Sequence, residues 1–354
     1  MLFLSTFTYK WLNWRRPSRP LHPLPSGITR FFVDTPSGKI EVLHAAAKPG
    51  SKPDQSPLFF VHGGMGGAWV WHEYLQYFSA KGIPCYAVSM RGHGDSWCPS
   101  FFGLTYCTTK RMLADDVLTG LRWAQEREGG REVVLVAHSS GGGLSQFILS
   151  EREVRVKGYV LVGAVPGYGS IGVYMHWFKL DPLFSFRTML HLWHPNSPLS
   201  HPVLLRRVFF SEQLSDDYVQ GFFEKASPYE SYLWIFGMAR TFVNPQTVLS
   251  QISSWGKSGQ SMMILRGEVD KIMPKSEMDK LADFYRKAFT GLVAQKKLDV
   301  EDTEVQPVSG EGGQDNDGHG VKISMVPGAG HHLQNDVTWE IGAEKLLAFY
   351  NQLD

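Results

Sequence analysis

Val133-Val134-Leu135-Val136-Ala137-His138-Ser139-Ser140-Gly141-Gly142 is the stretch that decides the expected fold of this 354-residue chain. Its leading apolar residues, mostly β-branched, predict a buried parallel strand. Ser139 follows the small residue Ala137 by two positions and precedes Gly141 by two. This small-x-Ser-x-Gly spacing is typical of a nucleophile elbow, a sharp turn from strand to helix that lifts the serine hydroxyl above the sheet.

Ser139 fits the elbow better than its neighbour Ser140. The Ser140 frame would put His138 at the position that needs a small side chain, whereas the Ser139 frame puts Ala137 there. Ala137 replaces the usual glycine and still lacks bulk. The first turn of the following helix would then direct the backbone amide of Ser140 at the reacting centre.

Several separate segments resemble the α/β-hydrolase superfamily, in the branch that carries a cap domain. Leu58–Met65 is similar to the third strand and its His-Gly turn, and Arg91–Ser96 to the turn after the fourth strand. Met262–Pro274 resembles the seventh strand with its acid turn, and Ile323–His331 the last strand with the loop that carries the base. The resemblance covers about residues 30 to 353, and the chain order Ser, Asp, His is the order of this fold.

The resemblance implies a catalytic triad of Ser139 as nucleophile, His331 as base and Asp270 as the carboxylate that orients the base. His331 competes with the adjacent His332, and Asp270 with Glu268 two residues earlier. The Gly-His placement after the strand favours His331, and the family position favours Asp270.

An oxyanion hole would complete this site. The expected donors are the backbone amides of Ser140 and of Gly64 or Met65, which follow the His-Gly turn. His62 and His138 are expected to bond to backbone nearby rather than to react. This scheme requires neither a metal ion nor an organic cofactor.

Alternating strand and helix patterns predict an α/β fold, with helices on both faces of a mostly parallel sheet. The resemblance implies eight strands and a helical cap inserted after the sixth. The core is expected at residues 29–166 and 258–354, the cap at 167–257 and an N-terminal arm at 1–28. Within the core, residues 299–320 are polar and Gly-rich, which predicts a disordered surface loop.

The expected cap has an unusual load of aromatic residues, too many for the core of so small a lobe. Some are expected to line an apolar cleft, and others to join the cap to the body. We expect Trp177 and Trp234 of the cap to bind substrate, together with Trp69 and Trp71 after the oxyanion turn. This composition favours a small lipophilic substrate over a sugar or a charged peptide.

The N-terminal arm has five basic and no acidic residues among its first 30 positions, together with Trp11 and Trp14. It is compatible with a mitochondrial presequence, with a contact to a membrane surface, or with an arm that packs its tryptophans on the body. A net charge of +1 argues against a nucleic-acid partner. Three cysteines without metal-ligand spacing make an intracellular, cytoplasmic location the default.

The leading function is a serine hydrolase that cleaves an ester, lactone or thioester of a lipophilic substrate through an acyl-enzyme on Ser139. The same triad could instead hydrolyse a carbon–carbon bond or transfer an acyl group to an acceptor. A ligand-binding protein without activity would not need all three residues. Epoxide and haloalkane chemistry is disfavoured, because those relatives place an aspartate where this chain has Ser139.

Overall fold

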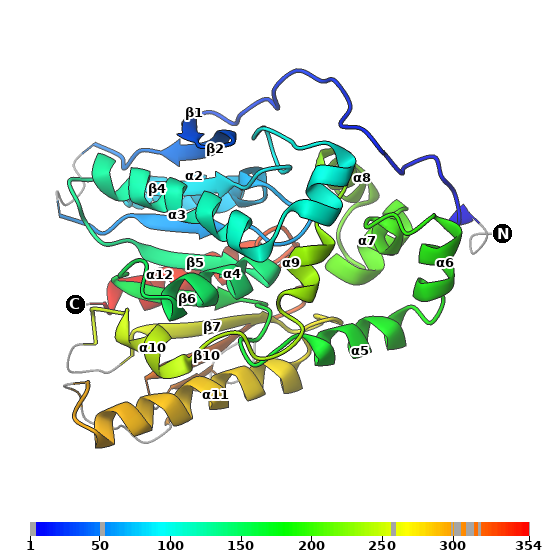
Figure 1. Ribbon diagram of the computed structural model, residues 1–354. Helices are drawn as coiled ribbons and strands as arrows, with labels where there is room; N and C mark the ends of the chain where they lie inside the picture. The colour runs from blue at the N-terminus through cyan, green and yellow to red at the C-terminus, as the bar shows by residue number, and fades with distance from the viewer. Residues whose placement is uncertain are drawn as a thin grey trace.

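A mostly parallel sheet runs through the centre of the protein (Figure 1). The computed structural model describes residues 5–49, 54–255, 260–298, 300, 306–308, 315–317 and 320–353. Within these residues the strand order is β1-β2-β4-β3-β5-β6-β7-β10-β9-β8. The strands are β1 (Ile28–Thr35), β2 (Gly38–Ala45), β3 (Leu58–Val61), β4 (Cys85–Ser89), β5 (Val134–His138), β6 (Gly158–Val162), β7 (Met262–Gly267), β8 (Gln306–Val308), β9 (Asp315–Asp317) and β10 (Val321–Val326).

The central strands are parallel, and those at the two edges run antiparallel to their neighbours. β4, β3, β5, β6, β7 and β10 pair in parallel, and β2 pairs antiparallel with both β1 and β4. Every residue of β3 to β6 is buried, because helices cover both faces of these strands. The chain therefore has the predicted α/β fold, in which strands buried on both faces are continuous apolar runs.

Two layers of helices cover the sheet (Figure 1). One face carries α3 (Lys110–Arg127), α4 (Ser139–Ser150), α10 (Pro245–Ser250) and α11 (Lys275–Ala294), which contact one another in that order. The other face carries α2 (His72–Ala80) and α12 (Trp339–Asn351).

A run of helices without a strand separates β6 from β7. It contains α5 (Ile171–Leu180), α6 (Phe184–Leu190), η3 (Ser197–Leu199), α7 (Pro202–Phe209), α8 (Asp216–Lys225) and α9 (Tyr232–Phe236). We call residues 167–244 the helical insert. The expected cap also included α10, but α10 packs between α4 and α11 and so belongs to the helix layer of the core.

The polar segment 299–320 differs in part from the expected loop. Most of it lies outside the described residues, but β8 and β9 pair antiparallel and extend the edge of the sheet, where Ile323 of β10 pairs with Asn316. The sheet thus has two strands beyond the eight expected. The prediction failed here because an edge strand needs only backbone hydrogen bonds and does not have to bury an apolar face.

The N-terminal arm crosses from β1 to α6 and packs on the body (Figure 1). The ring of Trp11 lies 5.4 Å from that of Phe223, and Trp14 lies 4.9 Å from His194. The guanidinium of Arg16 donates to the backbone carbonyl of Ser96 at 2.6 Å. Among the three alternatives for the arm (a presequence, a membrane contact or packing on the body), these contacts describe packing on the body.

Close backbone approach around β5 explains why small residues flank Ser139. Ser139 has a left-handed φ of 52°, so the chain turns sharply from β5 into α4. A Cβ on Gly141 would lie 2.1 Å from the carbonyl oxygen of His62, and one on Gly142 would lie 2.4 Å from the Cβ of Ala164. The strand and helix can meet at this turn only because these positions lack a side chain.

We therefore expect Gly141→Ala to lower the free energy of unfolding by about 1–3 kcal/mol, because the new methyl group overlaps backbone that cannot move aside. The matched control is Gly291→Ala in α11, where a Cβ would meet nothing within 4 Å. This second change should raise stability by up to about 1 kcal/mol through helix propensity. Urea denaturation of both variants measures the difference, and equal stabilities would contradict the close approach.

Candidate active site

Ser139, His331 and Asp270 meet at the carboxyl ends of three strands. The Nε2 atom of His331 lies 2.9 Å from the Oγ atom of Ser139, and its Nδ1 atom lies 2.8 Å from Oδ2 of Asp270. The imidazole of His331 is buried, whereas Ser139 is partly exposed. The structure thus brings together the three residues expected to form the triad.

The turn after β7 fixes the carboxylate of Asp270. Its Oδ1 atom accepts the backbone amides of Ile272 at 3.0 Å and Met273 at 2.8 Å. Oδ2 is therefore left to face His331. Glu268 points elsewhere: its exposed carboxylate accepts the amide of Gly328 at 2.8 Å.

The loop after β10 holds His331 in place from two sides. The Nε2 atom of His138 donates to the carbonyl oxygen of His331 at 3.0 Å, and burial lowers the pKa of His138 well below its usual range. The carboxylate of Asp336 accepts the amide of Gly330 at 2.8 Å. His138 is thus a neutral residue that supports the backbone of the base, the structural role expected from the sequence.

His332 takes a different path from His331. Its ring is buried beside Asn335, 3.3 Å from the side-chain oxygen, and its backbone amide donates to the carbonyl of Phe209 at 2.9 Å. Burial, together with the neighbouring His331, lowers the pKa of His332 well below the usual value. Its position under the insert keeps it apart from Ser139.

The turn after β3 supplies the amides expected to bind an oxyanion. Burial lowers the pKa of His62 well below its usual value, and this neutral ring bonds to the carbonyl of Gly63 at 2.7 Å. Met65 has a left-handed φ of 61°. As the second residue of α4, Ser140 lies in the first turn, whose amides have no acceptor within the helix.

The amide of Met65 is already engaged. It donates to Oε2 of Glu230 at 2.9 Å, and the carbonyl of Met65 accepts the amide of Ser227 at 2.9 Å. Both backbone groups of Met65 are therefore bonded to the helical insert. Of the two alternatives left open by the sequence, Met65 has its amide occupied in this conformation, and the part of Gly64 as an oxyanion donor stays a prediction.

Glu230 and His93 form a buried pair beside this turn. The Nδ1 atom of His93 lies 2.9 Å from the carbonyl of Arg91, and its Nε2 atom lies 2.9 Å from Oε2 of Glu230. Burial alone would lower the pKa of His93, but the charge and hydrogen bond of Glu230 outweigh it and raise that pKa. Burial would likewise raise the pKa of Glu230, but His93 and the amides of Met65 and Ser231 lower it. The two directions agree with a charged imidazolium–carboxylate pair.

Sequence reasoning missed Glu230. No local pattern marks the residue, because its partner Met65 lies 165 positions away along the chain. An acidic residue within an aromatic, otherwise apolar segment was the one available signal.

The sequence predicted that Arg91 and His93 hold the turn after β4 in place. Arg91 does so through two hydrogen bonds from its guanidinium to the buried carboxylate of Asp116, each 2.7 Å long.

The four tryptophans expected to bind substrate lie in different surroundings. Trp71 is fully buried against Phe60, with ring centroids 4.8 Å apart, and is a core residue. Trp234 is also buried, with its ring perpendicular to that of His93 and the centroids 5.9 Å apart. Trp69 packs on Phe222 of the insert at 4.7 Å, and Trp177 is half-buried beside Phe184. Their part in substrate binding stays a prediction, and the full burial of Trp71 and Trp234 does not favour it for these two.

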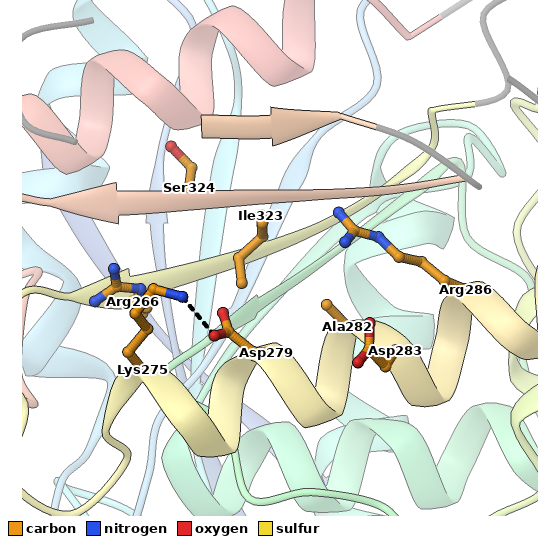
Figure 2. A pocket seen from close by; sticks show the side chains of 8 residues that line it. All are labelled: Arg266, Lys275, Asp279, Ala282, Asp283, Arg286, Ile323 and Ser324. Atoms are coloured by element: carbon orange, nitrogen blue, oxygen red, sulfur yellow. Dashed lines mark hydrogen bonds and ion pairs between the residues drawn. The ribbon is translucent and has the colours of Figure 1, made fainter. Parts of the chain in front are cut away.

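Two charged or polar pockets lie away from these residues. The first, shown in Figure 2, has a volume of about 250 Å³ between α11 and the strands β7 and β10, with the ion pair Lys275–Asp279 at its edge. The second, of about 450 Å³, lies at the amino ends of β5 and β6. Neither is lined by a residue of the expected triad, so neither is the candidate active site.

Comparison with known proteins agrees with this fold. The profile of the Alpha/beta hydrolase family matches residues 58–337. This match spans most of the chain and includes the elbow, the acid turn and the loop of the base. The protein belongs to the alpha/beta hydrolase family.

Individual relatives are more distant. The non-heme chloroperoxidase CPO-A1 of Kitasatospora aureofaciens is 33% identical over 111 residues, which is 31% of this chain and 37% of that protein. The chain thus matches little more than a third of the length of this relative. A thermophilic esterase from Thermogutta terrifontis superposes with a TM-score of 0.59 at 14% identity, covering 92% of this chain and 98% of the esterase.

A carbon–carbon bond hydrolase has the same fold. The 2-hydroxy-6-oxo-6-phenylhexa-2,4-dienoate hydrolase of a Rhodococcus species superposes with a TM-score of 0.57 at 14% identity, covering 92% of this chain and 99% of the hydrolase. At such identities the likeness establishes the fold and leaves the reaction to be argued from the site.

The Glu230–His93 pair predicts a pH-dependent contribution to stability. The contribution of His93 is complete below the ordinary histidine pKa of 6.5 and is lost as the pH rises through its raised pKa. That of Glu230 is complete above the ordinary pKa of 4.5 and is lost as the pH falls through its lowered pKa. Glu230→Gln should therefore cost stability, about 1–3 kcal/mol, mainly between these two values.

Denaturant unfolding of wild type and Glu230→Gln from acid to alkaline pH measures this window. The control is Glu268→Gln, which removes an exposed carboxylate. If the difference in the free energy of unfolding between wild type and Glu230→Gln does not become smaller toward alkaline pH, His93 is not charged in the folded protein.

Proposed function

We propose that the protein is a serine hydrolase that cleaves an ester, lactone or thioester of a lipophilic substrate through an acyl-enzyme on Ser139. The observation that carries this proposal is the continuous hydrogen-bonded path from Asp270 through His331 to Ser139, with distances of 2.8 and 2.9 Å. A serine hydroxyl is a weak nucleophile at neutral pH, and such a path is what activates it.

The proposed reaction begins with proton transfer to His331. Because Nδ1 of His331 faces the carboxylate of Asp270, the ring proton lies there and Nε2 can accept the proton of Ser139 as Oγ attacks the carbonyl carbon. The tetrahedral intermediate collapses when His331 returns this proton to the leaving group. Water then attacks the acyl-enzyme, with His331 again as base, and releases the acid.

The backbone amides of Gly64 and Ser140 would stabilise the oxyanion. In this proposal Glu230 is a positioning residue: its carboxylate holds the amide of Met65, next to Gly64, and so fixes the turn that presents the Gly64 amide. A Cβ built on Gly64 would lie 3.6 Å from Oε2 of Glu230, which places this carboxylate beside Gly64 as well as Met65.

The surroundings of the base favour an apolar substrate. The ring of Phe209 lies 5.8 Å from that of His331, and Phe222 contacts both Phe209 and Trp69. We propose that the helical insert, which contributes Phe209 and Phe222, acts as a cap. Aromatic walls of this kind suit an acyl or aryl group better than a sugar. Carbon–carbon bond hydrolysis by the same triad is the alternative.

Labelling with a fluorophosphonate probe tests the nucleophile. We expect wild type to be labelled and both Ser139→Ala and His331→Ala to lose labelling, since the first lacks the reacting atom and the second lacks its base. Asp270→Asn should label about 10⁴-fold more slowly, whereas the control Glu268→Gln should label like wild type. A folded wild type that resists the probe would contradict the proposal.

The same preparation separates the two chemistries. Mass spectrometry of wild type quenched during turnover of an aryl ester should detect an acyl adduct on the peptide that contains Ser139. Ester turnover without such an adduct would favour the carbon–carbon bond hydrolase.

The positioning role of Glu230 predicts a change in kcat with little change in KM. Glu230→Gln, which keeps the size of the side chain, should lower kcat on an aryl ester about 10-fold, and Glu230→Ala about 10²-fold, since the loss of one oxyanion donor costs about 10²–10³. Steady-state kinetics of both variants measure kcat and KM separately. A rise in KM at constant kcat would instead make Glu230 a substrate-binding residue.

A further inference from the structure

The outer surface of the helical insert exposes many large apolar side chains. Among the described residues, the exposed large apolar side chains lie on the arm, beside η2 (Gly103–Cys107) or on the insert, with the exceptions of Phe32, Val269 and Val337. We call one group the apolar face: Phe186, Leu192 and Trp193 on and after α6, Phe236 on α9, and Phe102 and Tyr106 beside η2. Contiguous exposed groups of this kind mark interaction sites in soluble proteins.

Ring contacts and one hydrogen bond join these elements into one surface. Tyr106 lies 5.6 Å from Phe102 and 5.9 Å from Tyr232 of α9. Tyr232 stacks on Phe236 at 5.9 Å, and its hydroxyl donates to the carbonyl of Trp193 at 2.8 Å. The apolar face is therefore continuous from η2 across α9 to the end of α6.

The N-terminal arm borders the apolar face. Figure 1 places the amino end of the chain beside α6, and the ring of Phe7 lies 6.1 Å from that of Phe186. The hydroxyl of Tyr9 donates to the carbonyl of Leu190. The arm thus adds its own exposed Tyr9 and Trp14 to the edge of this surface.

The backbone at the centre of the face is held in an unfavourable conformation. Leu192 and Trp193 have left-handed φ values of 52° and 58°, which side chains larger than glycine rarely adopt. These two side chains are 68% and 63% exposed. Strain of this kind is common at functional sites, and here it points two bulky side chains at solvent.

The segments that carry the apolar face are poor in exposed acidic residues. Residues 154–211 contain a single acidic residue, Asp181, which is 4% exposed and pairs with Arg187. Two exposed cations of the arm lie next to its exposed rings: Lys10 follows Tyr9, and Arg15 follows Trp14. Lys179 is a further exposed cation, on α5 of the insert. The exposed acidic residues of the insert lie at 212–224, on and before α8.

We propose that the apolar face docks the protein onto the surface of an anionic lipid bilayer. Apolar side chains would enter the boundary between headgroups and acyl chains, tyrosine and tryptophan would lie at the level of the headgroups, and the exposed cations of the arm would meet lipid phosphates. In the part of the chain that the structure describes, no helix is both long and apolar enough to cross a bilayer. This docking proposal uses no residue of the proposed triad, so it is independent of the proposed reaction.

Vesicle flotation of the full-length chain tests this docking. Wild type should float with vesicles of phosphatidylcholine that contain about a third phosphatidylglycerol, and more weakly with phosphatidylcholine alone. The double variant Leu192→Ser/Trp193→Ser should lose binding to both kinds of vesicle. Lys10→Glu/Arg15→Glu should weaken binding to the anionic vesicles about tenfold or more and leave binding to phosphatidylcholine unchanged.

Matched controls lie away from the face. Phe32→Ser removes an exposed ring on β1 and Lys287→Glu reverses an exposed charge on α11, and both should float like wild type. Circular dichroism and thermal unfolding should show that the variants keep the fold. Wild type that floats with neither vesicle overturns the proposal. So does a wild-type dimer that the Leu192→Ser/Trp193→Ser change converts to monomer, since a second copy would then cover the face.

Discussion

The left-handed turn at Ser139 is the constraint on which the rest of the site depends. A side chain in this conformation costs about 1–3 kcal/mol, and the conformation persists only where surrounding contacts enforce it. Here β5, a fully buried strand, ends and α4 begins at once, with Gly141 against the carbonyl of His62. The turn after β3 lies against the same two serines: a Cβ on Gly63 would lie 2.7 Å from the Cβ of Ser139, and one on Gly64 would lie 3.5 Å from the Oγ of Ser140.

The helical insert braces the site from the other side. Glu230 and Ser227 bond to the amide and carbonyl of Met65, and Ser211 bonds to the carboxylate of Asp336, which also holds Gly330 beside the base. The insert is therefore attached to both the turn after β3 and the loop of His331. Any displacement of the insert would act on both halves of the reacting centre, because these hydrogen bonds are buried and costly to leave unmade.

A local pattern made Ser139 predictable, and the resemblance to the superfamily indicated Asp270 and His331 in the segments that follow two further strands. Glu230 was not predictable, because its role depends on a contact between segments 165 residues apart. Trp71 shows the same limit: its residue type suits a substrate pocket or a core equally well, and only the packing against Phe60 decides. The pair β8 and β9 was missed because backbone pairing at a sheet edge leaves little trace in hydrophobic pattern.

The many aromatic residues of the insert lie on two different surfaces, an inner one and an outer one. Inward, Phe209 packs on His331, Phe222 on His332 and Trp234 on His93. Outward, Trp193 and Phe236 are exposed to solvent. A helix that serves only as a cover would be polar on its outer side. The exposed outer rings are therefore not explained by covering the active site. The buried hydrogen bonds of Glu230, Ser227 and Ser211 hold the insert in place on its inner side while these rings face solvent.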